Sequence, residues 1–186
     1  DTWQERWGNT DRVLTEEQNE SVAMQTFSGL DLTKRIVEGQ AGIDGMTAAK
    51  RCWNYQKGGF QWYLPCLMEL GVLCAYRDEI NKAMKEIGCP DECLLPTEDS
   101  DETWDWSSSE FSQGGSWYVG FSCGNFFNGY LKYGSGMVRA VAAFQPSPSL
   151  LTGEAKSNDC LHSDEALINM LRERGYKGEL TKTLTI

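Results

Sequence analysis

The sequence predicts an α+β fold, in which helices and short strands share one hydrophobic core. Two patterns support this fold class. In residues 117–121, large apolar side chains alternate with Tyr118 and Gly120, which is the two-residue period of a strand buried on one face. In residues 78–87, apolar side chains recur at the i, i+3, i+4, i+7 spacing of an amphipathic helix, and Gly88 follows as a stop.

Length and charge limit the function classes. With 186 residues, the chain fits one domain of ordinary size that can bury a core. The formal net charge of −10, without clusters of Lys and Arg, argues against nucleic-acid and anionic-membrane partners. No apolar run approaches the roughly 20 residues of a membrane span, and no basic-then-apolar signal peptide begins the chain. We therefore expect no nucleic-acid partner and no membrane insertion.

The first third of the chain is predicted to be mainly helical. Residues 1–29 are polar and are interpreted as an arm wrapped on the core, with residues 15–18 as the capping box of a short helix. Helical spacing predicts further helices over residues 31–38 and 46–55, each followed by glycine. Residues 60–64 are predicted to form a strand, which the next residue, a proline, stops.

Two helices and an acidic loop are predicted next. The first helix starts near Pro65 with an apolar stripe of leucines, and the second spans residues 78–87. We expect both helices to face the core. Residues 98–105 are rich in Asp and Glu, whose oxygens could hold calcium, but their spacing matches no calcium loop. This loop is therefore interpreted as a solvated turn.

The stretch 104–144 is rich in aromatic residues and repeatedly interrupted by glycine. Beyond Phe121 the alternation ends, and the glycines predict irregular backbone. The closing run 137–144 predicts a strand buried deep in a sheet, where Arg139 needs a partner or a route to solvent. Large rings on a loop-like backbone suggest a contact surface.

The chain is expected to divide at the proline-containing run 145–149. Residues 1–144 would form one domain with an N-terminal arm, and residues 145–186 a linker plus an appendage. The appendage is predicted to contain a helix over residues 164–174 and a strand over residues 180–186. Because so small a unit cannot bury a core alone, it must pack on the domain or on another chain.

Seven cysteines, an odd number, leave at least one thiol unpaired within the chain and fit a protein made in a reducing cytoplasm. Cys52, Cys66 and Cys74 lie among apolar neighbours and are interpreted as small buried hydrophobes. Cys89 and Cys93 have a zinc-like spacing, but a structural zinc needs four ligands and no second pair lies near them. We expect neither a metal nor any other cofactor.

Five segments together resemble a known family. They are GGFQWYLPCLMEL at 58–70, RDEINKAMKEIG at 77–88, WSSSEF at 106–111, SWYVGF at 116–121 and MVRAVAAF at 137–144. This combination resembles the C-type-lectin-like domain of the Legionella collagen-like adhesin, and still more the variable proteins of diversity-generating retroelements. The resemblance covers residues 31–144. It implies a C-type-lectin-like fold of the formylglycine-generating-enzyme kind, with short antiparallel sheets and flanking helices.

The resemblance also implies a set of variable ligand-binding positions. In that family, mutagenesis at template adenines turns Asn codons into a limited set of residues on a solvent-facing patch. The positions here whose residue types can be reached from Asn in this way are Tyr118, Gly120, Ser122, Cys123, Phe127, Gly129, Tyr130, Leu131, Tyr133, Gly134 and Gly136. Trp117, Val119, Phe121 and residues 138–144 are implied to be a fixed frame. Lys132 and Met137 cannot be reached from Asn codons by adenine changes.

The function implied is that of a non-enzymatic display protein, on a phage virion or a bacterial cell surface, which binds a protein or glycan receptor on a cell. Related display proteins often trimerise, so a homo-oligomer is an open expectation. One alternative is a constant bacterial adhesin or glycan-binding domain. Another is a thiol-dependent oxidase of the related fold, which needs two cysteines together for copper, whereas only Cys123 lies in the stretch 104–144. A Ser-His-Asp hydrolase would depend on His162, whose neighbour Ser163 is better explained as a helix cap.

Overall fold

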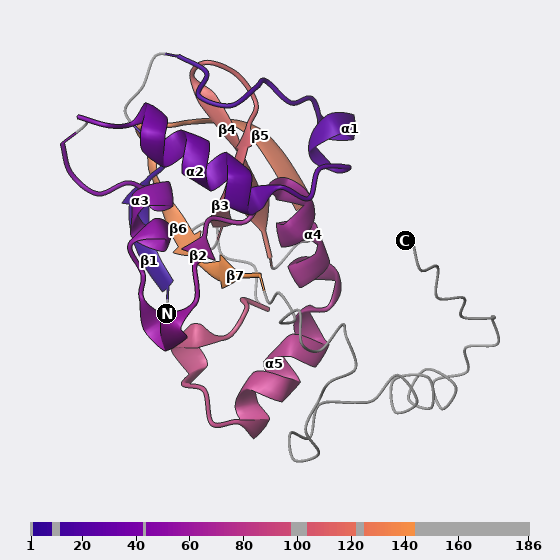
Figure 1. The fold of residues 1–186 in the computed structure, drawn as a ribbon. Helices are drawn as coiled ribbons and strands as arrows, with labels where there is room; N and C mark the ends of the chain where they lie inside the picture. The colour runs from indigo at the N-terminus through magenta and orange to yellow at the C-terminus, as the bar shows by residue number, and fades with distance from the viewer. Residues whose placement is uncertain (1, 9–11, 43, 98–103, 122–124, 144–186) are drawn as a thin grey trace, which may run out of the picture. The chain divides into compact units, whose positions relative to one another are not determined.

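The fold is α+β, with a curled, mostly antiparallel sheet and flanking helices (Figure 1), which confirms the predicted class at this level. The computed structural model describes residues 2–8, 12–42, 44–97, 104–121 and 125–143, and of Thr2 and residues 125–129 it describes the backbone. All of these residues belong to one unit, residues 1–144. The predicted linker, helix and strand over residues 145–186 lie outside the described residues, as do residues 98–103 of the predicted acidic loop.

The main sheet has five strands in the spatial order β1-β6-β3-β4-β5. They are β1 Thr2–Arg6, β3 Trp104–Glu110, β4 Gly115–Gly120, β5 Asn125–Leu131 and β6 Ser135–Arg139. Neighbours run antiparallel except β3 and β6, which run parallel. A second sheet pairs β2 Trp62–Tyr63 with β7 Val141–Ala142. The chain thus returns to the sheet at β6, between β1 and β3, before crossing to the second sheet.

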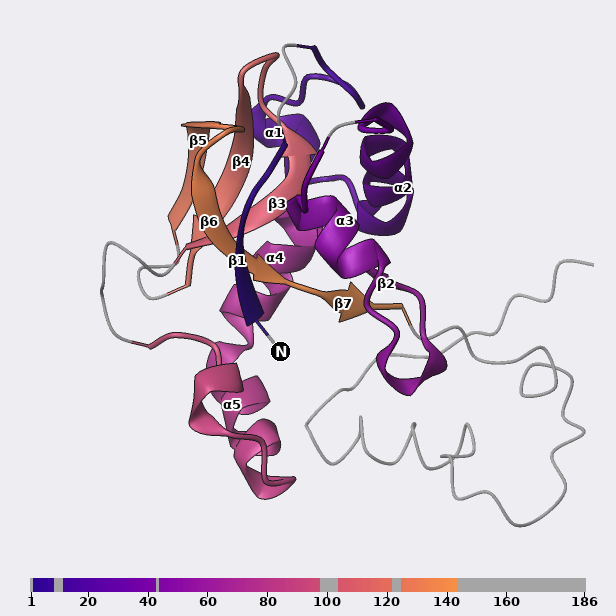
Figure 2. The same cartoon turned by 90° about the vertical axis from the view of Figure 1, so that its left-hand side faces the viewer.

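Five α-helices lie among the described residues. They are α1 Glu20–Ala23, α2 Gly29–Gly39, α3 Ala48–Trp53, α4 Leu67–Ala75 and α5 Arg77–Glu86, with short 3-10 turns at Lys57–Gly59 and Asp91–Cys93. Figures 1 and 2 show α2 and α3 packed together beside the sheet. Here α2 contacts β3 and α3 contacts β6 and β1, while α4 contacts β3 and β4.

Alternation along the strands gives the sheet two buried faces. On one face, Trp106 and Val138 pack with residues of α2 and α3 around Trp7. On the opposite face, Trp117 and Val119 pack with residues of α4. Each fully buried large apolar side chain contributes about 1.5–3 kcal/mol of transfer free energy, so these faces hold the domain together. The predicted frame residues in residues 117–121 are confirmed as core.

Two predicted helices are confirmed with close boundaries. Helix α2 buries Leu32 and Ile36 and ends at Gly39. Helix α4 begins after Pro65, as expected, and its first turn is capped by Glu69, whose Oε2 accepts a hydrogen bond of 2.8 Å from the backbone N of Cys66. Local sequence signals therefore sufficed for both.

The N-terminal residues differ from prediction. Instead of an arm, they form β1, which pairs with β6, and Trp7 is completely buried with its indole N donating to the carbonyl of Ser107 at 2.8 Å. The predicted capping box over residues 15–18 is wrong, because α1 begins at Glu20 and Asn19 caps it through its Oδ1. Thr15 bonds elsewhere, to a buried carboxylate on β3.

Three strand predictions also need correction. The backbone after Phe121 is not irregular throughout, because β5 pairs with β4 over Asn125–Leu131. The predicted strand over residues 60–64 is limited to Trp62–Tyr63. The run 137–144 is split, since β6 lies inside the main sheet and β7 pairs with β2 in the second sheet. Pairing partners distant in sequence decided each outcome.

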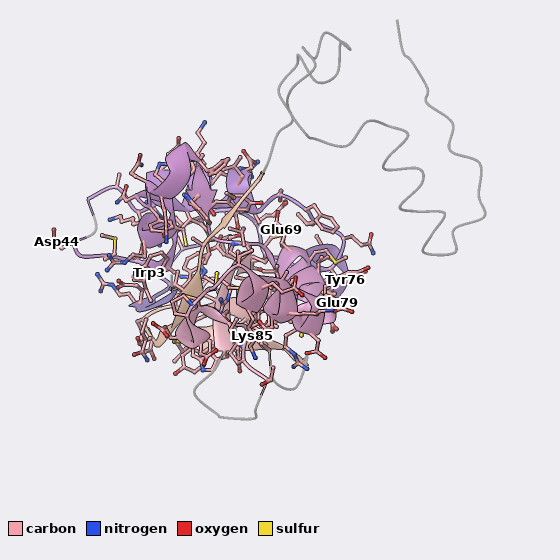
Figure 3. The ribbon with its side chains drawn as sticks, turned by 90° about the horizontal axis from the view of Figure 1, so that it is seen from below. Trp3, Asp44, Glu69, Tyr76, Glu79 and Lys85 are labelled. Carbon is pink, nitrogen blue, oxygen red and sulfur yellow. The ribbon has the colours of Figure 1, made fainter. Side chains whose placement is uncertain are left out.

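Helix α5 forms as predicted, but only part of its apolar stripe meets the core: Ile80 packs against the cluster around Trp117, while the end of the stripe is exposed. Ile87 follows its last turn and is 79% exposed, and the buried residue of the helix is Asn81. The Asn81 side chain donates to the carbonyl O and accepts from the N of Leu95, at 2.8 and 2.7 Å, which fixes the following loop. Tyr76, at the start of this helix, lies at the periphery of the domain (Figure 3). Ile80 and the Asn81 hydrogen bonds therefore hold the helix, and its C-terminal end is exposed.

Candidate ligand-binding surface

A bulge in β3 determines which of its side chains lie on the same side of the sheet as Tyr118. Trp106 pairs with Tyr118 and Glu110 pairs with Ser116, so β3 advances four residues while β4 advances two. At the bulge, the Ser116 hydroxyl donates to the carbonyl of Ser109 at 2.7 Å. Bulges re-aim side chains at functional edges of sheets. This one places Trp106 and Glu110 on the same side of the sheet as Tyr118.

Four aromatic rings from three strands form one cluster on this side of the sheet. They belong to Trp104, Trp106, Tyr118 and Tyr130, and we call the side of the sheet on which they lie the ring face. The Trp104 ring centre lies 4.4 Å from that of Tyr130 and 4.7 Å from that of Tyr118. The Trp106 indole N donates to the backbone O of Glu5 at 3.1 Å, which anchors the cluster to β1. Tilted and edge-on pairs each add about 0.5–1.5 kcal/mol, so Tyr130 is held in place before any ligand arrives.

Two glycines make room for these rings. A Cβ on Gly136 would lie 2.2 Å from Cζ3 of Trp104, and a Cβ on Gly134 would lie 2.3 Å from Cε1 of Tyr130. Neither glycine has a positive φ, so space and not backbone conformation requires it. Both positions belong to the predicted variable set, yet each is packed against a ring that the cluster needs.

The predicted variable positions fall into distinct environments. Exposed large side chains occur at Tyr130, Leu131 and Tyr133, with exposed fractions of 40%, 46% and 68%, and these three residues are called the exposed patch. Tyr118 and Gly134 are half-buried, and Gly120 and Gly136 are buried. Phe127 and Gly129 belong to β5, whose backbone alone is described there, and Ser122 and Cys123 lie outside the described residues.

The residues of the exposed patch do not all lie on one face of the sheet, although a single solvent-facing patch was expected. Between β4 and β5, Tyr118 pairs with Phe127 and Ser116 with Tyr130, so β5 advances three residues while β4 advances two. This bulge puts Tyr130 on the ring face, opposite Ser116. Leu131 pairs with Gly115 and, by strand alternation, lies on the side of Trp117. The patch therefore surrounds the end of β5.

A buried ion pair fixes the turn that carries Tyr133. Lys132 and Glu110 are 2% and 0% exposed, and Nζ lies 2.5 Å from Oε1. The ammonium also donates to the carbonyl of Gln113 at 2.8 Å and lies 4.8 Å from the ring centre of Trp7. The buried contacts of Lys132 thus fix the backbone position of its exposed neighbours, Leu131 and Tyr133.

The Glu110 carboxylate also orders the N-terminal segment. It accepts hydrogen bonds from the backbone N of Leu14 at 2.9 Å and from the hydroxyl of Thr15 at 2.6 Å. Sequence reasoning missed this network and the roles of Trp104 and Trp106. The two tryptophans are two residues apart, so they lie on one face of their strand, and Trp106 pairs with Tyr118 of the neighbouring strand. This two-residue spacing was the sequence signal that could have indicated the ring face.

The far end of the sheet is fixed by Arg139. As predicted, this half-buried arginine has partners: it donates to the carbonyl of Cys93 at 3.2 Å and lies 3.8 Å from Oδ1 of Asp105. Its guanidinium also lies 5.6 Å from the ring centre of Phe121. Asp105 was predicted to belong to a solvated turn, which is wrong, because it is buried in β3. Burial raises the pKa of the Asp105 carboxyl, while the charge of Arg139 opposes that rise.

Stability should therefore depend on pH through Asp105 in a defined direction. A carboxyl whose pKa is higher in the folded state contributes stability below its unfolded pKa and loses that contribution as the pH rises through the folded pKa. We expect the unfolding free energy of the wild type, minus that of Asp105→Asn, to fall as the pH rises from the ordinary value of 3.8 toward neutrality. Guanidinium unfolding at several pH values measures this difference. An increase with pH would contradict the assignment.

The thiols of the described core are placed for packing. Cys52 and Cys66 are buried as predicted, whereas Cys74 is half-buried. Burial raises the pKa of Cys66 to about 11 and raises the pKa of Cys52 further, so both stay protonated at neutral pH. Within the described ranges, no three His, Cys, Asp or Glu residues come together in a way that could hold a metal ion.

These features define an α+β domain with a rigid aromatic face that ends in an exposed patch at one sheet edge. Comparison of the chain with protein-family models, with curated proteins and with solved structures finds no match. Among the helices that the structure describes, none is both long and apolar enough to cross a membrane.

Proposed function

We propose that this chain is a ligand-binding display protein with a C-type-lectin-like fold, diversified by a retroelement, which binds a protein or glycan receptor on a cell surface. Its setting would be a phage virion or a bacterial surface. The observation that supports this proposal best is the combination of an exposed patch with a fixed base. Tyr130 rests on the aromatic cluster, and Tyr133 follows the buried Lys132.

Such an arrangement separates stability from recognition. Substitutions of exposed side chains usually change stability by less than about 0.5 kcal/mol, so the patch can change without unfolding the domain. Tyrosine supplies a large contact area with few rotatable bonds, as in antibody loops. A tyrosine already held by neighbouring rings loses still less freedom on binding, which favours affinity.

One observation favours the alternative of a constant adhesin or glycan-binding domain. Gly134 and Gly136 lack space for the side chains that diversification would introduce. Sequencing the genomic neighbourhood distinguishes the two functions. A near-copy of the segment coding for residues 106–144, with Asn codons at the variable positions and a reverse transcriptase beside it, would support the diversified binder. Its absence would favour the constant surface.

Loss of the exposed tyrosines should weaken binding. We expect that a screen of the full chain against arrays of purified cell-surface proteins and glycans yields a ligand, and that Tyr130→Ala with Tyr133→Ala weakens its binding by at least about tenfold, because interface tyrosines are frequent hot spots. Phe60→Ala, which removes an exposed ring outside the patch, is the matched control. A ligand whose affinity responds equally to both changes would count against this surface.

A further inference from the structure

We propose, building on the proposed function, that the outer edge of β5 binds an extended segment of the receptor polypeptide, which adds to the sheet as a further strand. The exposed patch would contact the side chains of this segment. The ligand class is therefore a protein with an accessible extended stretch, and a glycan would not use this mode. Four observations support the assignment.

The first observation is the position of β5 at the end of the sheet. In the part of the chain that the structure describes, β4 is its one strand neighbour. Figure 2 shows β5 at the side of the sheet away from α2 and α3. Successive residues of an antiparallel strand direct their backbone groups to alternate sides, so about half of those of an edge strand point away from its neighbour. Those groups are the partners that an added strand uses.

The second observation is a contrast between the two edges. The other edge strand, β1, carries the charged residues Glu5 and Arg6, and Glu5 pairs with Arg51 of α3. Helix α3 also contacts β1. Charges and covering helices are the usual means by which proteins prevent pairing at a sheet edge. Residues 125–131 contain neither a charged residue nor a proline, two further features that prevent edge pairing, so β5 lacks the charges that β1 carries.

The third observation is the placement of the exposed patch on both sides of this edge. Tyr130 lies on the ring face beside Trp104, and Leu131 lies on the side of Gly115 and Trp117. A partner that lay flat on the ring face would contact Tyr130 but not Leu131. A strand added at the edge presents its side chains alternately to both faces and would contact both residues.

The fourth observation concerns the bulge in β5. Because it lies between Phe127 and Tyr130, the ladder with β4 runs over residues 125–127 and resumes at Tyr130 and Leu131, two residues of the exposed patch. Backbone pairing at residues 125–127 would fix the direction of the bound segment, and the patch would read its side chains. Backbone hydrogen bonds do not depend on side-chain identity, so this docking mode would survive changes at the variable positions.

The test uses peptides of about nine residues, the length of a long strand, selected from a random phage-displayed library against the full chain. Asn125→Lys introduces a positive charge into β5, and Gln4→Lys makes the same amide-to-ammonium change on β1, where Gln4 is exposed. We expect the selected peptides to slow amide exchange of residues 125–131 by at least about tenfold, Asn125→Lys to weaken their binding by at least about tenfold, and Gln4→Lys to leave it unchanged.

Several results would overturn the proposal. These are recovery of no peptide, protection elsewhere in the chain, equal effects of the two lysine substitutions, or β5 amides that already exchange as slowly as those of β4 in the free protein. A concentration-dependent dimer that Asn125→Lys abolishes would assign the edge to a second copy of the chain instead. If a receptor depends on Tyr130 and Tyr133 but not on Asn125→Lys, the proposed function stands and this inference alone falls.

Discussion

Lys132→Met is expected to lower the free energy of unfolding by about 3–5 kcal/mol, the usual effect of removing one partner from a buried ion pair. The substitution removes the ammonium that lies 2.5 Å from Oε1 of Glu110, and the carboxylate stays completely buried. Hydrogen bonds from Leu14 and Thr15 remain, but they do not supply a positive charge. Guanidinium denaturation of the purified variant measures the loss.

The comparison variant is Arg35→Met, which breaks the exposed pair between Arg35 and Asp31 on α2. Exposed pairs of this kind contribute about 0–1 kcal/mol, so the two losses should differ severalfold. The double variant Glu110→Leu with Lys132→Met should recover part of the stability, because it leaves no unpaired buried charge. Equal, small losses for Lys132→Met and Arg35→Met would show that the pair does not hold the turn.

The same residue explains a feature of the sequence that the family resemblance left open. Lys132 lies between Leu131 and Tyr133, two positions predicted to vary, yet its codon cannot be reached from Asn by adenine changes. Its burial under Trp7 and beside Glu110 gives a structural reason for a fixed residue there. Whether its neighbours vary stays a prediction.

Local patterns predicted those elements whose stability depends on neighbours in sequence. Helices α2 and α4 and the strand containing Trp117 are examples, because their apolar periodicity lies within the element itself. Strands β1 and β5 could not be predicted in this way. Their polar residues and glycines give no clear apolar alternation, and the two strands form because β6 and β4 supply their backbone hydrogen-bond partners.

The candidate surface was predictable in part for the same reason. Large rings among glycines suggested a contact surface in residues 104–144, and the family resemblance implied Tyr130 and Tyr133 within it. What supports them depends on register between distant strands: Glu110 reaches Lys132, and Gly136 lies under Trp104. The apolar stripe of α5 shows the opposite error, since a clear helical period ended in an exposed Ile87.

Gly136→Ala is expected to destabilise the domain by about 1–3 kcal/mol, the usual effect of adding volume to a well-packed site. The new methyl group would lie 2.2 Å from Cζ3 and 2.3 Å from Cη2 of Trp104, and 2.9 Å from Nε1 of Trp106. Trp104 cannot move aside freely, because its ring packs against Trp106, Tyr118 and Tyr130. Relief of the clash must displace the ring on which Tyr130 rests. Weaker near-ultraviolet circular dichroism, together with a lower unfolding free energy, would report this displacement.

Gly114→Ala is the matched control, because nothing lies within 4 Å of a Cβ at that turn and its φ is not positive. Replacing glycine where the backbone permits it restricts the unfolded chain, so this variant should be neutral or more stable by about 0.4–1 kcal/mol. If Gly136→Ala behaved like Gly114→Ala, the ring face would be adaptable, and position 136 could vary as the resemblance implies. If it destabilises as expected, diversification can act at Tyr130, Leu131 and Tyr133 only while Gly136 stays constant, since Gly136 leaves the space that the Trp104 ring occupies.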